Sequence, residues 1–133
     1  MMNKNLSPEL LRVCDANLNR LREGIRVIED ISRYKNNDKE TALKLKTLRH
    51  LTQLENYKTL LQYRDSINDV LKSSTKSEQN RNSLEDIIIS NFKRAEESSR
   101  VLEEIFKLED IKISEKFKHI RYQLYDIEKQ ILL

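Results

Sequence analysis

Two stretches of this chain, NLNRLREGIRVIEDI at residues 17–31 and NFKRAEESSRVLEEI at residues 91–105, align without a gap. Most of the positions that they share are polar: Asn17/Asn91, Arg20/Arg94, Glu23/Glu97, Arg26/Arg100, Val27/Val101, Glu29/Glu103 and Ile31/Ile105. A repeated apolar pattern would mean only that two helices bury similar faces. Repeated Asn, Arg and Glu instead indicate a duplicated helix that carries a duplicated set of polar side chains.

The duplication continues beyond these two stretches. LKTLR at residues 45–49 matches FKHIR at residues 117–121, so each half contains a second helix. Two helix pairs related by a pseudo-twofold predict a four-helix bundle in which each half covers the apolar face of the other. We place the halves at about 8–62 and 83–132, joined by a polar segment at 63–82.

The composition supports an all-α fold. One Gly and one Pro in 133 residues leave few of the turn residues that β-hairpins need, whereas Leu, Ile, Glu, Lys and Arg are abundant. This length suits one domain, which we place at 1–133. The chain should therefore form a single all-helical domain.

Capping residues and apolar spacing locate the helices. The first should begin at Ser7-Pro8 and end near Tyr34, and the second should begin near Lys39. Ser83 should cap a third helix that reaches about Leu108, and Ser114 should open the last. The first two helices should face inward with Leu11, Cys14, Leu18, Leu21, Ile25 and Ile28, then with Ala42, Leu45, Leu48, Leu51 and Leu54. Lys46, Arg49 and His50 should face outward from the second helix.

Charge and cysteine content exclude several classes of protein. The 25 basic and 22 acidic side chains are interspersed, and a net charge of +3 is too small for a nucleic-acid-binding surface. The single Cys14 excludes a disulfide framework and indicates a buried reduced thiol. No apolar run approaches the roughly 20 residues that span a bilayer, and no secretory leader is evident. We expect a cytoplasmic protein without membrane or nucleic-acid partners.

The repeated polar residues form the first candidate site. On a helical wheel, Arg20 and Glu23 fall on one stripe beside the apolar face, and Arg94 and Glu97 form the same stripe in the second half. A pseudo-twofold could bring both sets to one shared crevice. The alternative is a pair of ordinary i,i+3 surface ion pairs worth roughly 0.2–0.5 kcal/mol each.

A second candidate site lies in the weakly periodic segment. Asp65 and Asp69 are two carboxylates four residues apart beside Arg64, a set that could hold Mg²⁺ and a phosphate together. The alternative is a loop turn capped by these aspartates. His50 and His119 have no neighbouring His or Cys, which argues against zinc.

These motifs resemble a known family. The run DANLNRLREGIRVIED at residues 15–30 resembles the opening signature of a small helical domain often fused ahead of thiamine-phosphate synthase. LRH at 48–50, RDSINDV at 64–70 and NFKRAEESSRVLEE at 91–104 resemble its later landmarks, in order. Two positions depart from the family pattern, Leu71 where Gly is usual and Ser98 where Ala is common. We expect the domain to stand alone here.

The resemblance implies a phosphomethylpyrimidine kinase, which uses ATP to convert hydroxymethylpyrimidine phosphate to its diphosphate for thiamine synthesis. Such a site must supply cations that offset the repulsion between two polyanions. It implies ATP and Mg²⁺ as cofactors, with Asp65 and Asp69 at the metal. The residues that would act in catalysis are Arg20, Glu23, Arg26, Asp65, Arg94 and Glu97. Those that would bind substrate are Asn17, Lys46, Arg49, Arg64, Asn91 and Arg100, with the two asparagines on the pyrimidine.

A different class of function is also compatible with the sequence. The charged stripes could form the interface of a non-catalytic helical module that dimerises or docks onto a thiamine-phosphate synthase. Such a module would show no turnover. A homodimer is compatible with both readings, because polar stripes on both long helices leave room for a second interface.

Overall fold

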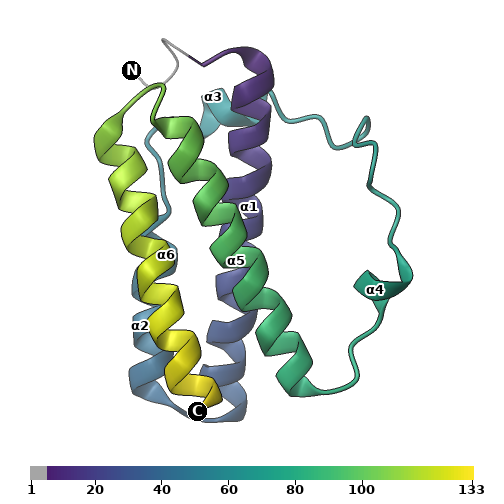
Figure 1. Ribbon diagram of the computed structural model, residues 1–133, viewed down its shortest axis with the longest axis vertical. Coiled ribbons are helices and arrows are strands. Elements are labelled where there is room, and N and C mark those ends of the chain that lie inside the picture. Colours follow the sequence, from purple (N-terminus) through teal and green to yellow (C-terminus); the bar gives the residue numbers. More distant parts are fainter. Residues whose placement is uncertain (1–5) are drawn as a thin grey trace.

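The computed structural model describes residues 6–133, and these form an all-α structure, as predicted (Figure 1). The first five residues of the predicted domain 1–133 lie outside the described part. The elements are α1 (Pro8–Asp30), the π-helical segment η1 (Ile31–Lys35), α2 (Lys39–Leu51), α3 (Tyr57–Gln62), α4 (Lys76–Gln79), α5 (Leu84–Phe106) and α6 (Ile111–Leu132).

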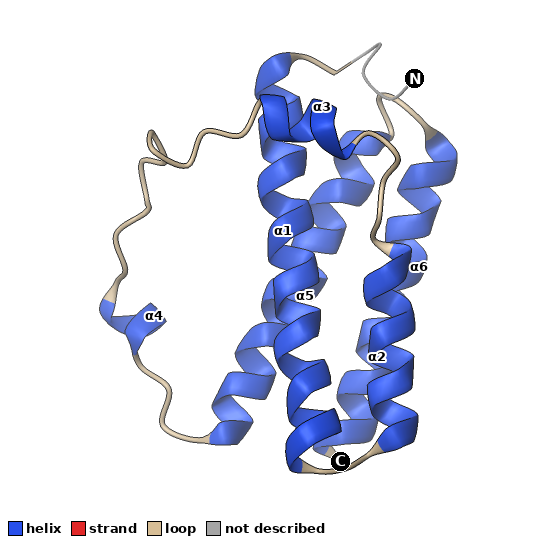
Figure 2. Cartoon of the chain, turned by 180° about the vertical axis from the view of Figure 1, so that it is seen from behind, coloured by secondary structure: helices blue, strands red, loops and turns tan. Residues whose placement is uncertain are grey.

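Four long helices make the bundle. The helix α1 packs against α2 and α5, and α6 packs against α5 and α2, so that α1 and α6 lie diagonally across the bundle (Figures 1 and 2). The short helix α3 packs on α1. The segment between α3 and α5, which carries α4, arcs away from the bundle beside α5 (Figure 1). This arrangement leaves one face of α1 open near its N-terminus.

Capping residues fix the helix starts. The side chains of Ser7, Asp38 and Ser83 each accept a backbone N–H of the first turn, as the sequence predicts for α1 and α5. The predicted start of α6 at Ser114 is wrong, because Asp110 caps this helix and it begins three residues earlier. Ser114 is buried instead, and its hydroxyl donates to the Glu103 carbonyl at 2.7 Å.

The helix ends also differ in detail. The first helix passes Asp30 into η1, so its predicted end near Tyr34 falls inside the π-helical turn, and Asn37 then reverses the chain with φ of 50°. The helix α2 ends at Leu51, which is 40% exposed, and Leu54 lies in the connection that follows. The predicted inward positions Leu51 and Leu54 therefore do not continue the buried stripe of α2, although Leu54 packs against the core.

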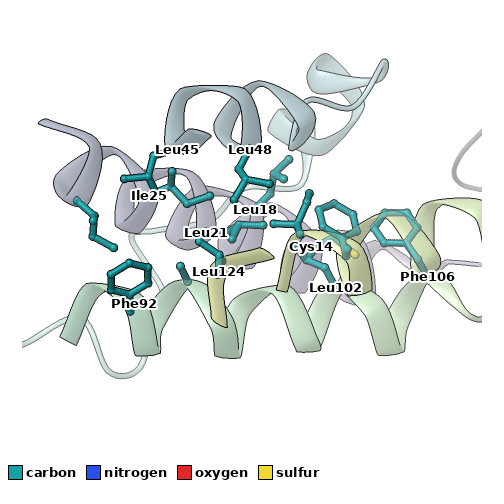
Figure 3. Packing of buried hydrophobic residues seen from close by; sticks show 14 of the residues in the cluster. Cys14, Leu18, Leu21, Ile25, Leu45, Leu48, Phe92, Leu102, Phe106 and Leu124 are labelled. Atoms are coloured by element: carbon teal, nitrogen blue, oxygen red, sulfur yellow. The ribbon is translucent and has the colours of Figure 1, made fainter. Parts of the chain in front are cut away.

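The core fills the space between the four long helices (Figure 3). It contains all six predicted apolar residues of α1 together with Leu45, Leu48, Phe92, Leu102, Phe106, Phe117, Ile120, Leu124 and Ile127. Gly24 allows α1 and α5 to approach closely, because a Cβ atom there would lie 3.0 Å from the Asn91 carbonyl oxygen and 3.3 Å from the Ala95 Cβ.

Each half contains an ion pair at the same repeat positions. In the first half Arg49 donates to Glu29 from Nε at 2.6 Å and from Nη2 at 3.0 Å. In the second half Arg121 donates to Glu103 from Nη2 at 2.7 Å, and both side chains are buried. The predicted outward direction of Arg49 is therefore wrong, because the guanidinium turns back to α1. The twofold relation between the halves stays a prediction.

In the described part of the chain, none of the helices has the length and apolar character that a bilayer crossing requires. Cys14 is a free thiol and is buried, as predicted.

Candidate functional site

A cleft of about 550 Å³ opens between the N-terminal half of α1 and the segment that follows α3. Five of the residues singled out from the sequence line it: Asn17, Arg20, Arg64, Asp65 and Asp69. The other lining residues are Glu9, Arg12, Val13, Asp15, Ala16, Asn19 and Ser66. The cleft therefore brings Asn17 and Arg20, two of the repeated polar residues, to the second candidate site, which lies more than 40 residues further along the sequence.

Two arginine contacts hold the walls of the cleft together. Arg64 donates to both oxygens of Asp15, from Nε at 2.8 Å and from Nη2 at 2.9 Å. Arg12 donates to the backbone carbonyl of Asp65 from Nη2 at 2.7 Å. The hydrogen bonds to Asp15 raise the pKa of Arg64 above its usual value. Such bidentate pairs fix geometry as well as charge, so segment 64–69 is attached to α1 at two points.

Asp65 and Asp69 shape the turn that follows. The carboxylate of Asp65 accepts from the Asn68 backbone N–H at 3.2 Å and from its side-chain amide at 2.8 Å. Oδ1 of Asp69 accepts from the Leu71 backbone N–H at 2.9 Å. The capped turn considered as the alternative for these aspartates is therefore present. Each carboxylate oxygen has two lone pairs, so this capping leaves acceptor sites unused.

The charges in the cleft favour a metal-bound anion over a bare one. Three arginines face four carboxylates among its lining residues, and Arg64 is already paired with Asp15. The hydrogen bonds from Asn68 lower the pKa of Asp65, so this carboxylate is ionised at neutral pH. Within residues 6–133 no group of three or more His, Cys, Asp or Glu side chains could hold a metal. Two carboxylates nevertheless suit Mg²⁺, which commonly takes one or two carboxylates, waters and substrate phosphates.

Several predicted site residues lie elsewhere in local pairs. Arg26 pairs with Asp30 at 3.3 Å and Arg100 pairs with Glu104 at 3.2 Å, both on exposed helix surface. Arg49 forms an ion pair with Glu29. Lys46 and Glu29 both line a separate recess of about 440 Å³. The cleft therefore does not include these four residues.

The repeated stripe of Arg20, Glu23, Arg94 and Glu97 is exposed. None of these four side chains forms an ion pair with another described residue, so the i,i+3 pairs considered as the alternative are absent from residues 6–133. Asn17 and Asn91 both donate from Nδ2 to a carbonyl one turn earlier, that of Val13 at 3.0 Å and that of Ile87 at 2.8 Å. Of this set, only Asn17 and Arg20 line the cleft.

Sequence reasoning did not single out Glu9, Arg12, Asp15, Asn19 and Ser66 as site residues. Asp15 and Asn19 lie inside the first motif, and Ser66 lies inside RDSINDV. The only indication in the sequence that they belong to a site is that they are next to predicted site residues. Arg12 lies three residues before Asp15, on the same face of α1. Glu9 carries no such signal, because a negative charge in the first turn is common in helices.

Comparison with known proteins identifies relatives of this chain. Residues 12–130 match the ThiD2 family. The chain is 39% identical over 140 residues to a thiamine-phosphate synthase of Prochlorococcus marinus subsp. pastoris, covering 99% of the chain and 39% of the relative. It is 38% identical over 122 residues to a thiamine-phosphate synthase of Nostoc punctiforme, covering 91% of the chain and 35% of the relative.

The chain thus spans less than two fifths of the length of the curated relatives that it matches. No solved structure matches it.

Proposed function

The chain belongs to the ThiD2 family, and from this premise we propose that it is a phosphomethylpyrimidine kinase of thiamine biosynthesis. It would transfer the terminal phosphoryl group of ATP to hydroxymethylpyrimidine phosphate. The observation that carries the proposal is the cleft that unites the polar face of α1 with the loop RDSINDV through the Arg64–Asp15 pair. Both stretches belong to the motifs that resemble this kinase family.

The reaction needs little acid–base chemistry from the protein. An oxygen of the acceptor phosphate, already ionised near neutral pH, forms a bond to the γ-phosphorus, and the bond from that phosphorus to the β-bridging oxygen breaks to release ADP. No proton has to leave the nucleophile. Catalysis then depends on alignment and on stabilising charge at the transferred group.

The arginines of the cleft are suited to bind the phosphates. Arg20 has no partner among the described residues, and Arg12 uses one of its five N–H donors on the Asp65 carbonyl. Arg64 has three N–H donors beyond the two that bind Asp15, and the Tyr57 hydroxyl lies beside this guanidinium and can take one of them. These free donors can hold two phosphate groups side by side and offset their repulsion.

The carboxylates suit a divalent cation. Asp65 and Asp69 lie on one turn of the cleft and would hold Mg²⁺ together with water and phosphate oxygens. A bound Mg²⁺ supplies charge neutralisation at the β- and γ-phosphates. Without a metal, the excess of carboxylates over arginines in the cleft would repel a triphosphate. We therefore expect nucleotide binding to depend on the metal.

The test is release of ADP from Mg-ATP and hydroxymethylpyrimidine phosphate by the purified chain, with Arg20→Ala and Asp65→Ala as site variants. Lys129→Ala and Asp126→Ala are matched controls of the same charge change on α6, diagonally across the bundle. We expect turnover in the unmodified chain and both controls and a loss of at least about a hundredfold in the site variants. Turnover unaffected by the site variants would exclude this cleft, and no turnover in the folded unmodified chain would exclude the kinase.

A second candidate is a non-catalytic module that docks onto a thiamine-phosphate synthase. It is favoured by the relatives, which carry that name, and by Ile67, Val70 and Leu71, whose apolar side chains are strongly exposed on one loop. This candidate predicts that Val70→Ser weakens association with the synthase in sedimentation velocity. It also predicts that Arg20→Ala leaves nucleotide binding unchanged.

A further inference from the structure

A further recess lies between α1, α3 and the connection that follows α2. It measures about 300 Å³ and is lined by Leu18, Arg22, Gln53, Leu54, Tyr57 and Leu60. Leu18 and Leu60 are core residues and give it an apolar floor, whereas Tyr57 is half exposed at its rim. A recess of this size is at the small end for ligand sites and suits one ring better than a nucleotide.

Arg22 brings an unsatisfied donor to this recess. Its Nε atom is buried and has no hydrogen-bond partner within residues 6–133. A buried donor left without a partner costs roughly 1–3 kcal/mol, which makes such atoms uncommon unless water or a ligand completes them. Because Nε itself has almost no accessible surface, an acceptor in the recess would meet the outer Nη groups of the same guanidinium, which form no hydrogen bond or ion pair with another described residue.

Tyr57 connects the recess to the cleft. The phenol lines the recess, and its hydroxyl lies beside the Arg64 guanidinium, where it adds to the raised pKa of Arg64 after the larger contribution of Asp15. Arg64 in turn lines the cleft. A ligand with a ring in the recess could therefore place a substituent at Arg64, where the phosphate-binding donors begin.

The wall opposite α1 is held in place. Lys116 on α6 donates from Nζ to the Gln53 carbonyl at 3.0 Å, and burial lowers the pKa of this lysine. The connection after α2 is thus attached to the bundle at the residue that lines the recess. The side-chain amide of Gln53 has no partner among the described residues and can form a hydrogen bond to a substituent of the ring.

We propose that this recess binds the pyrimidine ring of the phosphate acceptor, with Tyr57 against the ring and Arg22 donating to a ring acceptor atom. The proposal rests on the proposed function and assigns two specificity-determining residues, Arg22 and Tyr57. The ring lies in the recess, its phosphate reaches Arg64, and the triphosphate occupies the cleft. At about 300 Å³ the recess suits one ring better than a whole nucleotide, which assigns it to the acceptor and leaves the cleft to the donor.

The test measures ring binding without the reaction. Hydroxymethylpyrimidine, which lacks the phosphate, is titrated into the chain and followed by NMR shifts and by calorimetry. We expect Arg22→Met and Tyr57→Leu each to weaken its binding about tenfold, and Tyr57→Phe, which keeps the ring, to change it less than about twofold. Tyr122→Leu is the matched control, because Tyr122 is similarly exposed on α6 and lies outside both cavities.

The readouts separate this proposal from the kinase itself. Ring binding that is lost in Arg22→Met and Tyr57→Leu supports the recess even if the chain shows no turnover, and only the proposed function then fails. In a chain that turns over, these variants should raise KM for the acceptor while KM for ATP stays constant. Unchanged ring binding and acceptor KM in both folded variants would overturn the proposal, as would an unmodified chain that does not bind the pyrimidine.

Discussion

Arg64 binds Asp15 through two parallel hydrogen bonds across 49 residues of sequence, and this pair joins the loop of the cleft to α1. The Asp15 side chain is buried and that of Arg64 is about one third exposed. Asp15→Ala should therefore destabilise the chain by about 1–2 kcal/mol, between the values for exposed and buried ion pairs. Urea unfolding followed by circular dichroism measures this change.

Arg26→Ala is the control for that measurement. It removes an i,i+4 pair with Asp30 whose side chains are both about half exposed, and its cost should stay under about 0.5 kcal/mol. Equal unfolding midpoints for Asp15→Ala and Arg26→Ala would mean that the Arg64 pair does not anchor the loop. Faster amide hydrogen exchange in residues 64–70 of Asp15→Ala is the second expected result.

Leu71 should not need to be glycine. Within the described residues, Asn37 is the only non-glycine with a positive φ, so the backbone at Leu71 is one that any residue adopts. Its side chain is exposed, and the contact to Asp69 uses its backbone N–H, which glycine also has. Leu71→Gly should change kcat/KM for ADP release by less than about twofold. A gain of tenfold or more would show that substrate binding requires a left-handed backbone there.

Periodicity and capping predicted most of the fold. The six apolar residues of α1 are buried as predicted, and Ser7 and Ser83 cap where expected, because such signals depend on residues within one or two turns. The sequence alone misplaces the start of α6, because Asp110 and Ser114 are both good capping residues. Only the packing of Ser114 against the Glu103 carbonyl distinguishes them, and that contact is tertiary.

The site was predictable in part for the same reason. The polar motifs indicated Arg20 and Arg64, but the partner that brings them to one cleft, Asp15, lies 49 residues from Arg64. No local pattern encodes that distance. The sequence also does not predict that Arg49 turns inward toward Glu29, because a charged residue beside an apolar stripe is usually exposed.

The two equivalent ion pairs should be costly to break singly. Glu103→Gln leaves Arg121 buried, and Glu29→Gln leaves Arg49 largely buried, so each should lose about 3 kcal/mol of unfolding free energy. Burial alone would lower the pKa of Arg121, but its hydrogen bonds to Glu103 and Tyr125 raise it.

Replacing both partners of one pair tests the coupling between them. The double variant Glu103→Met with Arg121→Met should lose less than the sum of its single variants, because no unpaired charge remains. Urea unfolding of the four chains gives the coupling energy. Additive losses would mean that the two side chains stabilise the bundle independently.

Cys14 should be chemically inert in the folded chain. It is fully buried, and burial raises the pKa of its thiol to about 12. Only about one thiol in ten thousand would ionise at pH 8, and thiolate is the reactive form. Ellman's reagent should therefore react within seconds in denaturant and not over an hour in native buffer. Rapid labelling of the native chain would show that the core between α1 and α5 opens readily.

Glu96 should make the bundle less stable at alkaline pH. Its side chain is 5% exposed, and Lys93 contacts it at 3.4 Å while also contacting Glu128 at 3.2 Å. Burial, followed by the neighbouring Glu128, raises the pKa of Glu96 from 4.5 to about 8, although Lys93 acts in the opposite direction. Between pH 4.5 and about pH 8, the folded chain therefore keeps a proton on Glu96 that the unfolded chain releases. Stability from this group is complete below pH 4.5 and declines as pH rises to about 8.

Glu96→Gln removes this titration without a change in size. It should stabilise the chain by about 2 kcal/mol at pH 8.5, where the unmodified residue is ionised and poorly solvated, and by little at pH 4.5. Glu115→Gln, on the exposed face of α6, should shift neither value. Urea unfolding midpoints at pH 4.5 and pH 8.5 measure this difference. If Glu96→Gln and the unmodified chain lose the same stability between these two pH values, the alkaline loss comes from other groups.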